Sequence, residues 1–466
     1  MEKTDYIQGL YQKGTAAYWS IADYTQEQID AMLERMAAIV YKNADELGDM
    51  VYNETHLGDR NAHIRLMHVF PIAFWSYLKG KNAFGLLKND KERGIQTYGK
   101  AMGVVACLTP STTNISNAFE NTMKAVKSGN AIILAPHPRA WKSHKRMVEL
   151  MQEAIKSVGG PDNLVQSIED PTIEMSGELM ATCDVVVGTG GAEMVKAAYS
   201  SGTPAFGVGQ GCVPVIISES YPADEIDGVT ATNVADRANN NGMPCTCPQV
   251  VYIPKSRKDE IMTSYIKNGA FVVDDPDDIQ RIRELVFPGG GRSINRAVVG
   301  LPAAKIAELY GIGKVPEGTK VLMIPLAQGT CGGTDVLCQE IMNPTLRFQF
   351  YDDFADAVEL ARKGLFYEGA GHSAQIFSYE QEEIDLFAKR IPVVRVLVRQ
   401  GSAAVPNLTL SNGLAPSTSV GCGTWGGNSF SDNLDFTTLQ NHTMVVYPLE
   451  AKALPTAEEL FGDLIL

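Results

Sequence analysis

The 466-residue chain has no apolar run that reaches the roughly 18 residues a membrane helix requires. Its first residues, Met1 to Asp5, contain no apolar signal core. No internal repeat and no low-complexity tract is visible either. We therefore expect a soluble protein that stays in the cytoplasm.

The chain also lacks an excess of positive charge, since 40 Lys and Arg stand against 54 Asp and Glu, a formal net charge of −14. Binding to a phosphate backbone needs a concentrated basic face, and the sequence shows none. Nucleic acids and anionic membranes are therefore not expected as partners.

Cysteines are present without the regular spacing of a disulfide framework, which favours a reduced compartment. Cys245 and Cys247 form a C-x-C pair, but there is no second pair and no histidine nearby, so we expect no metal site. The eight cysteines are Cys107, Cys183, Cys212, Cys245, Cys247, Cys331, Cys338 and Cys422.

The length predicts two or three domains, and 45% hydrophobic residues supply ample core material. At the N-terminus Ile29, Met32, Met36 and Val40 recur mostly at helical steps, after a Thr25 to Gln28 segment that fits a capping box. We expect about the first 85 residues to be mainly helical.

From Gly103 onward, short apolar segments alternate with amphipathic ones, which predicts a parallel, doubly wound α/β sheet. A second β/α region spans 230–435, with a helix near 256–268, a strand at 321–324 and a helix near 353–363. In the first region the expected strands are 104–108, 131–135, 164–168 and 185–187, with helices near 114–127, 140–157 and 171–182.

Glycines mark two turns of interest. Gly188-Thr189-Gly190-Gly191 follows a strand and precedes a helix, an arrangement that lets backbone N–H groups approach a phosphate. Such turns also often merely join two elements. The glycines of 202–211 permit close backbone approach either to a ligand or to another strand, and the sequence leaves both open.

Cys245 follows a Gly242-Met243-Pro244 turn and precedes the strand-like run 250–253. A thiol in that position can meet a substrate, and as a thiolate it attacks carbonyl carbon. Free cysteines also commonly pack as small hydrophobic residues. His372, after Gly-Ala-Gly, lies on an expected loop from which its ring could reach a cleft, although a lone histidine is usually structural.

Taken together, these segments resemble the CoA-acylating branch of the aldehyde dehydrogenase superfamily. The resemblance covers nearly the whole chain in the expected order: Thr109 to Asn114, Ala135 to Arg139, Gly188 to Gly191, Gly207 to Gly211, Asn240 to Cys245, Gly371-His372 and Gly421 to Gly426. It implies an α/β fold with a Rossmann-type cofactor domain, an α/β catalytic domain and a small β oligomerisation arm. The implied boundaries are 1–90 with 103–228, then 229–438, and 91–102 with 439–466 for the arm, through which a homodimer or homotetramer would form.

The resemblance also implies roles for individual residues. Cys245 would be the nucleophile, and the Asn114 amide with the Cys245 N–H would stabilise the alkoxide. His372 would handle a proton or orient the acyl and CoA groups. Hydrolytic relatives carry a base glutamate where Val208 falls, and an apolar side chain cannot serve as a base. A thioester on Cys245 is therefore expected to pass to CoA rather than to water.

For the cofactor, the resemblance implies NAD or NADP without a metal. Arg139 would favour a 2′-phosphate, with a solvated side chain as the equally weighted alternative, and Glu340 would bind the nicotinamide ribose. Cys247 could be a backup thiol, and Cys212 would be open to oxidation. The implied cofactor-binding set is Thr109, Pro110, Ser111, Thr112, His137, Pro138, Arg139, Gly188, Thr189, Gly190, Gly191, Gly209, Gly211 and Glu340.

The substrate is less well encoded. Arg395 and Arg399 flank 396–398 and would form a fork for a carboxylate or sulfonate, although exposure to solvent is the more common fate of an arginine. The resemblance favours a short anionic aldehyde, sulfoacetaldehyde or succinate semialdehyde, over acetaldehyde or propionaldehyde. Two other functions remain open: a hydrolytic or phosphorylating dehydrogenase that uses another base, and a non-enzymatic nucleotide-binding module.

Overall fold

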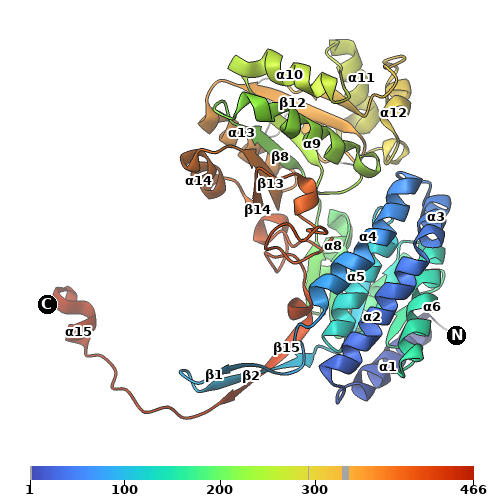
Figure 1. Ribbon diagram of the computed structural model, residues 1–466, viewed down its shortest axis with the longest axis vertical. Helices are drawn as coiled ribbons and strands as arrows, with labels where there is room; N and C mark the ends of the chain where they lie inside the picture. Colours follow the sequence, from blue (N-terminus) through green and yellow to red (C-terminus); the bar gives the residue numbers. More distant parts are fainter. Residues whose placement is uncertain (1–2, 292, 328–334, 466) are drawn as a thin grey trace.

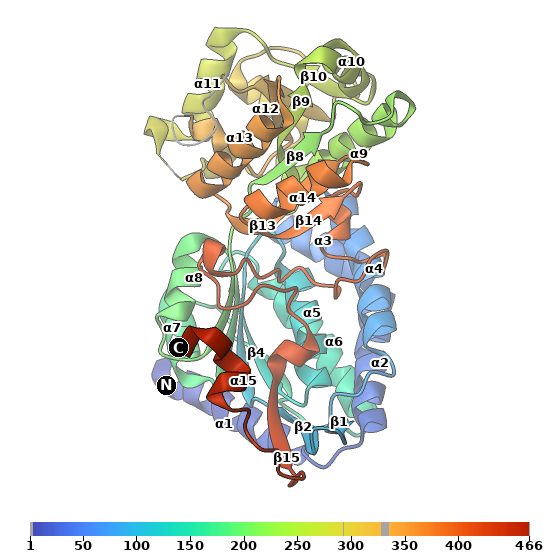
Figure 2. The same cartoon turned by 90° about the vertical axis from the view of Figure 1, so that its left-hand side faces the viewer.

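The computed structural model describes residues 3–291, 293–327 and 335–465, which form two α/β lobes and a projecting arm (Figure 1). Figure 2 shows the lobes one above the other, with the arm at the end of the first lobe that is distant from the second. Among the helices in these ranges, none combines the length and the apolar character needed to cross a membrane.

The chain begins with four helices that cover one side of the first lobe (Figure 1). The Thr25 capping box is present, with Gln28 as its partner, and Ile29, Met32 and Met36 are buried as the periodicity predicts. The four helices are α1 (Lys3–Ser20), α2 (Gln26–Lys42), α3 (Ala44–Thr55) and α4 (Arg60–Leu78).

A five-stranded parallel sheet, in the order β5-β4-β3-β6-β7, forms the core of the first lobe. The expected strands and helices are confirmed, because each buried strand is followed by a helix that covers the sheet. The strands are β3 (Val104–Thr109), β4 (Ala131–Pro136), β5 (Val165–Ser167), β6 (Val185–Thr189) and β7 (Ala205–Val208); the helices are α5 (Asn114–Lys127), α6 (Trp141–Ser157), α7 (Ile173–Thr182) and α8 (Ala192–Tyr199).

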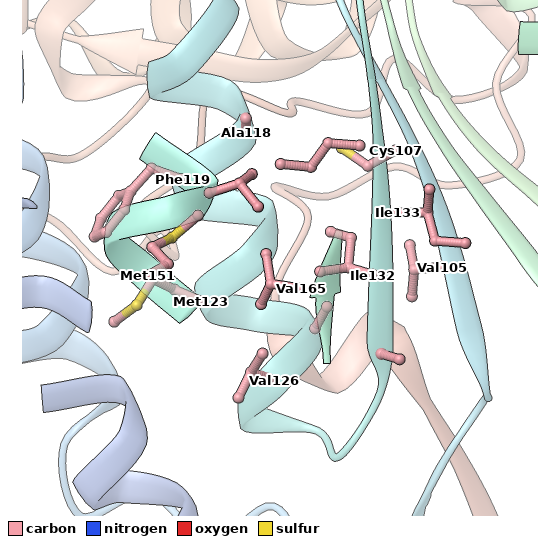
Figure 3. Close-up of a cluster of buried hydrophobic side chains, with 14 of the residues drawn as sticks. Val105, Cys107, Ala118, Phe119, Met123, Val126, Ile132, Ile133, Met151 and Val165 are labelled. Atoms are coloured by element: carbon pink, nitrogen blue, oxygen red, sulfur yellow. The ribbon is translucent and has the colours of Figure 1, made fainter. Parts of the chain in front are cut away.

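Figure 3 shows how this core is packed. The Phe119 ring lies on the side of α5 that faces away from the strands, where it contacts Phe74 of α4. The side chains of Phe119, Met123, Val126, Ile132 and Val165 are all fully buried. Helix α5 is buried along its whole length, which fixes its N-terminal residue, Asn114, at the edge of the sheet.

The second lobe has a seven-stranded parallel sheet in the order β10-β11-β12-β9-β8-β13-β14. The three elements expected there are confirmed, as β11, α10 and α13. The strands are β8 (Val213–Ile217), β9 (Pro248–Pro254), β10 (Ala270–Val272), β11 (Val321–Pro325), β12 (Thr345–Tyr351), β13 (Gly371–Phe377) and β14 (Val393–Val398). The helices are α9 (Ile226–Ala238), α10 (Lys258–Lys267), α11 (Pro276–Val286), α12 (Ala303–Tyr310), α13 (Phe354–Tyr367) and α14 (Gln381–Arg390).

The boundary between the two lobes differs from the expected one. β8 pairs with β9 and β13 of the second sheet, so the chain passes between lobes at 209–212, ahead of the boundary expected at 228. Only the four residues 209–212 separate β7 from the apolar strand β8, and they give no sequence signal for the change of sheet.

The arm is a three-stranded antiparallel sheet of β1 (Gly85–Asp90), β2 (Ile95–Ala101) and β15 (Gln440–Val446). It begins at 85, earlier than the expected 91. Beyond it the chain runs out to the short helix α15 (Ala457–Phe461), away from both lobes (Figure 1). Large apolar side chains are left exposed there, including Met444, Val446, Leu454, Leu460 and Leu464.

Candidate active site

The thiol loop is held in an unusual backbone conformation. Asn240, Asn241 and Gly242 have φ values of 44°, 52° and 72°, in the left-handed region that asparagine and glycine tolerate best. A Cβ on Gly242 would lie 2.4 Å from the Asn343 carbonyl oxygen, so only glycine fits. The loop therefore presents Cys245 from a fixed backbone just before β9.

Both lobes hold this loop. The Asn240 side-chain oxygen accepts the Asp59 N–H at 2.8 Å, and the Asn241 amide donates to the Gly58 and Gly300 carbonyls at 3.0 and 2.9 Å. Gly58 lies between α3 and α4, whereas Gly300 precedes α12 in the second lobe. Cys245 itself is partly buried.

The His372 ring is in hydrogen-bond contact with the thiol. Its Nε2 lies 3.2 Å from the Cys245 Sγ, and the ring is fully buried at the start of β13. A Cβ on Gly211 would lie 2.6 Å from the Cys245 carbonyl oxygen and 2.8 Å from the His372 Cγ. The close backbone approach that the glycines of 202–211 permit is thus made, at Gly211, to the Cys245 carbonyl and the His372 ring.

Behind His372 lies a buried arginine. Arg395 donates through Nε to the Ser373 Oγ at 3.3 Å and through Nη2 to the carbonyls of His372 and Gly421 at 3.0 and 2.7 Å. The Ser373 Oγ lies 3.1 Å from the His372 Nδ1. Since Arg395 can only donate, the Ser373 oxygen accepts its bond and the hydroxyl hydrogen can reach Nδ1; we assign it there, and in this assignment the ring hydrogen is on Nε2, facing the sulfur.

The expected arginine fork is not formed. Arg395 is 5% exposed and donates to protein acceptors, a fourth being the Asn433 side-chain oxygen at 3.2 Å. Arg399 is exposed beyond the end of β14, where it donates to the Ser378 carbonyl and stacks over Tyr379. Strand alternation alone would put residues 395 and 399 on the same face, but β14 ends at Val398 and Arg399 has a φ of 53°, so the chain turns and the two side chains do not share one anion site.

The electrostatics favour neutral side chains in the resting site. Burial, with the neighbouring Glu340 carboxylate, raises the pKa of the Cys245 thiol above its ordinary value, and Arg395 opposes the shift. Burial and Arg395 lower the pKa of His372 to about 3. A thiolate–imidazolium pair is therefore disfavoured at rest, and N–H donors must stabilise the negative charge when it forms.

The two other thiols named from the sequence, Cys247 and Cys212, are buried and bonded to backbone carbonyls. Cys247 is 1% exposed and its Sγ donates to the Asp236 carbonyl. Burial raises the pKa of Cys212 to about 12, and its Sγ donates to the Cys338 carbonyl, so the expectation that Cys212 is prone to oxidation does not fit its surroundings. The cysteines in the described ranges are free thiols, and Cys331 lies outside those ranges.

The first lobe supplies the opposite wall. Asn114 is 2% exposed at the first position of α5, and it lines a small cavity with Asn240 and with Pro244, the neighbour of Cys245. Val208, at the end of β7, is buried against Leu397 and Val405. No base can act from the Val208 position.

Most of the expected cofactor residues lie where parallel strands end. Thr109 ends β3 and Pro110 to Thr112 follow it, His137 to Arg139 follow β4, and Gly190 and Gly191 follow β6, so all share the edge of the sheet that faces the second lobe. Arg139 and Pro138 are exposed. A Cβ on Gly191, the residue before α8, would meet nothing within 4 Å, which leaves that backbone open to a ligand.

A cleft of about 510 Å³ lies beside α8, and its lining includes Ala192, Gly209, Gln210, Glu368 and Trp425. Its position between a glycine turn and a helix N-terminus suits a dinucleotide. The part of the chain that the structure describes contains no group of three His, Cys, Asp or Glu side chains arranged to hold a metal ion.

Glu340 lies beside this cleft, 6% exposed. Its carboxylate accepts the Gly211 N–H and the Gln210 side chain, and its own N–H donates to the Glu368 Oε2 at 2.5 Å. Burial, with the nearby Glu368, raises the pKa of Glu340 to about 8, against the effect of Arg237. A ribose diol would offer this carboxylate two donors.

Sequence reasoning missed Ser373, Gln210 and Glu368. Each lies within four residues of a residue that was identified: Ser373 follows His372, Gln210 lies between Gly209 and Gly211, and Glu368 opens the Glu-Gly-Ala-Gly-His segment. That proximity is the only signal that could have pointed to them, because neutral or single charged side chains have no distinctive spacing.

Comparisons with known proteins agree with this arrangement. Residues 3–418 match the model of the aldehyde dehydrogenase family. The chain is 38% identical to the succinate-semialdehyde dehydrogenase (acetylating) of Clostridium kluyveri, over 98% of this chain and 99% of that protein. It is 34% identical to a sulfoacetaldehyde dehydrogenase of Acholeplasma sp, over 98% and 94%. The crystal structure of an acetylating aldehyde dehydrogenase from Geobacillus thermoglucosidasius is 28% identical, with a TM-score of 0.91 over 98% of both chains.

Proposed function

The chain belongs to the aldehyde dehydrogenase family, as a CoA-acylating member, and we propose that it oxidises a short anionic aldehyde to the acyl-CoA through a thioester on Cys245. The observation that carries the proposal is the contact between the Cys245 Sγ and the His372 Nε2 at 3.2 Å, in a site with no base at the position of Val208. NAD or NADP, when bound in the cleft, takes up the hydride of the aldehyde.

In this mechanism the Cys245 thiol first loses its proton to solvent, and the thiolate then attacks the carbonyl carbon, so that the carbonyl oxygen becomes an alkoxide. The Asn114 amide donates to that oxygen, and one such donor is worth about 3 kcal/mol of barrier. The His372 Nε2–H donates a hydrogen bond to the Cys245 sulfur and stabilises its negative charge before the attack. When the alkoxide collapses with loss of the hydride, the carbon is left as a thioester on Cys245.

The thioester is then transferred to CoA. The CoA sulfur attacks the acyl carbon, Cys245 leaves as thiolate, and the CoA thiol proton is released, so that aldehyde, CoA and NAD(P)⁺ give acyl-CoA, NAD(P)H and one proton. Exchange between thioesters is nearly isoenergetic, so the reaction runs in both directions. Water would need a general base, and Val208 provides none.

The proposed substrate is succinate semialdehyde or sulfoacetaldehyde. These are the aldehydes in the names of the relatives that are 38% and 34% identical and that match this chain over nearly its full length. Because Arg395 is occupied by protein acceptors, another group must meet the anionic end of the substrate.

For assembly, we propose a homodimer or a dimer of such dimers, formed through the arm. The exposed apolar residues of β15 and of the segment beyond it, among them Met444, Val446 and Leu454, need a cover that the described part of the same chain does not provide. A cytoplasmic location is proposed as well, since the cysteines of the described ranges are free thiols.

One experiment tests the function directly. The protein is incubated with CoA, NAD or NADP, and each of succinate semialdehyde, sulfoacetaldehyde, acetaldehyde and propionaldehyde, while nucleotide reduction and acyl-CoA mass are followed. We expect acyl-CoA only when CoA is present, and the highest kcat/KM with an anionic aldehyde. With CoA withheld, intact mass should show the acyl group on the peptide of Cys245. Free acid formed at the same rate without CoA would refute the proposal in favour of hydrolysis.

A further inference from the structure

Asn114, the proposed alkoxide donor, is itself held by a second side chain. Its Nδ2 donates to the Ser143 Oγ at 3.2 Å, and that hydroxyl donates to the Glu54 Oε2 at 2.7 Å. The three residues come from α5, α6 and α3. Both Asn114 and Ser143 are buried, at 2% and 0% exposed, so water does not compete for these bonds.

The direction of the hydrogen bonds follows from the last member. A carboxylate only accepts, and Glu54 also accepts the N–H groups of Lys142 and Ser143 at 2.8 and 2.9 Å. The other acceptor within reach of the Ser143 hydroxyl is the Ala140 carbonyl, at 3.3 Å. The single hydroxyl hydrogen is therefore directed to an acceptor, and the Ser143 oxygen must receive its bond from Asn114.

This fixes the orientation of the Asn114 amide. Its NH₂ group faces Ser143, and its oxygen accepts the Ile115 N–H at 2.6 Å. One Nδ2 hydrogen remains, on the group that lines the cavity beside Pro244. With the amide rotated by half a turn, an oxygen would take the place of that donor and would repel the alkoxide.

We propose that Ser143, with Glu54 behind it, is a positioning residue that keeps the donor of Asn114 directed at the reacting oxygen. The proposal rests on the proposed function of Asn114. It is distinct from the role of Glu54 at the N-terminus of α6, where the N-cap residue Ala140 has no side-chain hydrogen bond and the Glu54 carboxylate takes its place. That capping role concerns backbone N–H groups and would survive loss of the Ser143 hydroxyl.

The test is a double-mutant cycle on the full-length enzyme with its aldehyde, cofactor and CoA. Asn114→Ala should lower kcat by about 10² to 10³-fold, as expected for loss of one donor. Ser143→Ala should lower kcat about tenfold, with the KM for aldehyde and for CoA within about twofold, because only part of the amide population is misdirected. In the double variant, the Ser143→Ala loss should vanish, since no amide remains to be oriented.

Ser157→Ala is the matched control, because Ser157 lies exposed in the last turn of the same helix and donates only to the Ala154 carbonyl. It should retain the parent kcat. If Asn114→Ala is as active as the parent, the proposed role of Asn114 fails and this inference with it. If Asn114→Ala is impaired while Ser143→Ala matches Ser157→Ala, or if the two losses multiply in the double variant, only the positioning role is overturned.

Discussion

The two walls of the thiol site each place a serine between a site side chain and a charged side chain, but the two charges have opposite sign, and Arg395 is buried whereas Glu54 is only partly buried. On the side of the seven-stranded sheet, Ser373 lies between His372 and Arg395. On the side of the five-stranded sheet, Ser143 lies between Asn114 and Glu54. Arginine can only donate and a carboxylate can only accept, so the two hydroxyl hydrogens point in opposite directions.

The difference explains how two neutral side chains come to act alike. An imidazole has one hydrogen to place on either nitrogen, and a donor behind Nδ1 moves that hydrogen to Nε2. An amide has a donor end and an acceptor end, and an acceptor behind it keeps the donor end in place. Both walls thus present N–H groups to the site, which suits an anionic sulfur or oxygen, and neither the His372 Nε2–H nor the Asn114 NH₂ group can act as a base toward water.

The largest expected effect on activity comes from removing the Cys245 sulfur, which lies between the two walls. Cys245→Ala should reduce CoA-dependent nucleotide reduction by about 10⁴-fold or more, because no other nucleophile lies at the end of the thiol loop. Cys247→Ala is the control, since its buried sulfur is bonded to the Asp236 carbonyl and should be dispensable for kcat. Steady-state rates measure both, and inactivity of Cys247→Ala with an intact fold would contradict the assignment of the nucleophile.

Removing the charge behind His372 should damage the fold itself. Arg395→Met leaves the carbonyls of His372 and Gly421 without their donor in a buried site, which should lower the free energy of unfolding by about 3 kcal/mol. The measurement is urea denaturation without ligands. Arg399→Gln should change it by no more than about 0.5 kcal/mol, because Arg399 is exposed.

The Arg399→Gln variant also tests whether Arg395 and Arg399 form the expected fork for an anionic substrate. If the fork existed, Arg399→Gln would raise the KM for an anionic aldehyde while leaving the KM for acetaldehyde unchanged. We expect the KM values to stay as they are for both substrates.

Replacing the donor of the histidine wall should affect the chemistry more than the fold. His372→Leu should lower kcat by about 10²-fold, and His372→Gln should retain more activity, because an amide can still donate to the sulfur. Since the pKa of His372 is about 3, its protonation should not limit kcat between about pH 5 and pH 9. An acidic limb of the pH–rate profile that disappears in His372→Gln would show that the ring acts as a base instead.

The smallest expected effect concerns cofactor binding at Glu340. With a pKa of about 8, this carboxyl is protonated in the empty site below that pH, and a ribose diol binds the ionised form better. NAD(P) affinity should therefore rise by about tenfold per pH unit up to pH 8 and then level off. Calorimetric titration from pH 6 to pH 9 measures it, and Glu340→Gln should show a weak affinity without the pH dependence.

The free energy of unfolding should fall as the pH rises, which is the opposite of the expected change in cofactor affinity. The pKa of Glu340 in the folded protein is above the ordinary carboxyl value, so the folded state holds the proton more tightly. Its contribution to stability is present at acidic pH and is lost as the pH rises through about 8. In the absence of cofactor, Glu340→Gln should flatten the fall in unfolding free energy over this range. The same slope in the parent and the variant would contradict the assignment of the pKa to Glu340.

Much of the scaffold could be predicted because its signals are local. The capping box of Thr25 and the alternation of buried strands with helices report directly on structure, and the position of Cys245 ahead of β9 follows from them. The change of sheet between β7 and β8 could not be predicted, since both segments are equally apolar and pairing partners are not written in either one.

The site could be predicted only where a residue type is itself distinctive. A cysteine after a glycine–proline turn and a histidine after glycines stand out, and the structure brings Cys245 and His372 together. Arg395 was interpreted as a substrate contact, because a sequence does not show that four protein acceptors surround it. Ser143 and Glu54 escaped notice for the same reason, as serine and glutamate in helices are ordinary.

The Asn241 side chain donates to the Gly58 carbonyl in one lobe and to the Gly300 carbonyl in the other, so it links the two lobes by hydrogen bonds. Any parting of the lobes must pull on this amide before it disturbs either sheet. In mild denaturant, enzyme activity should therefore be lost while the circular dichroism of both lobes is still native. A preparation in which both lobes are folded can thus be inactive.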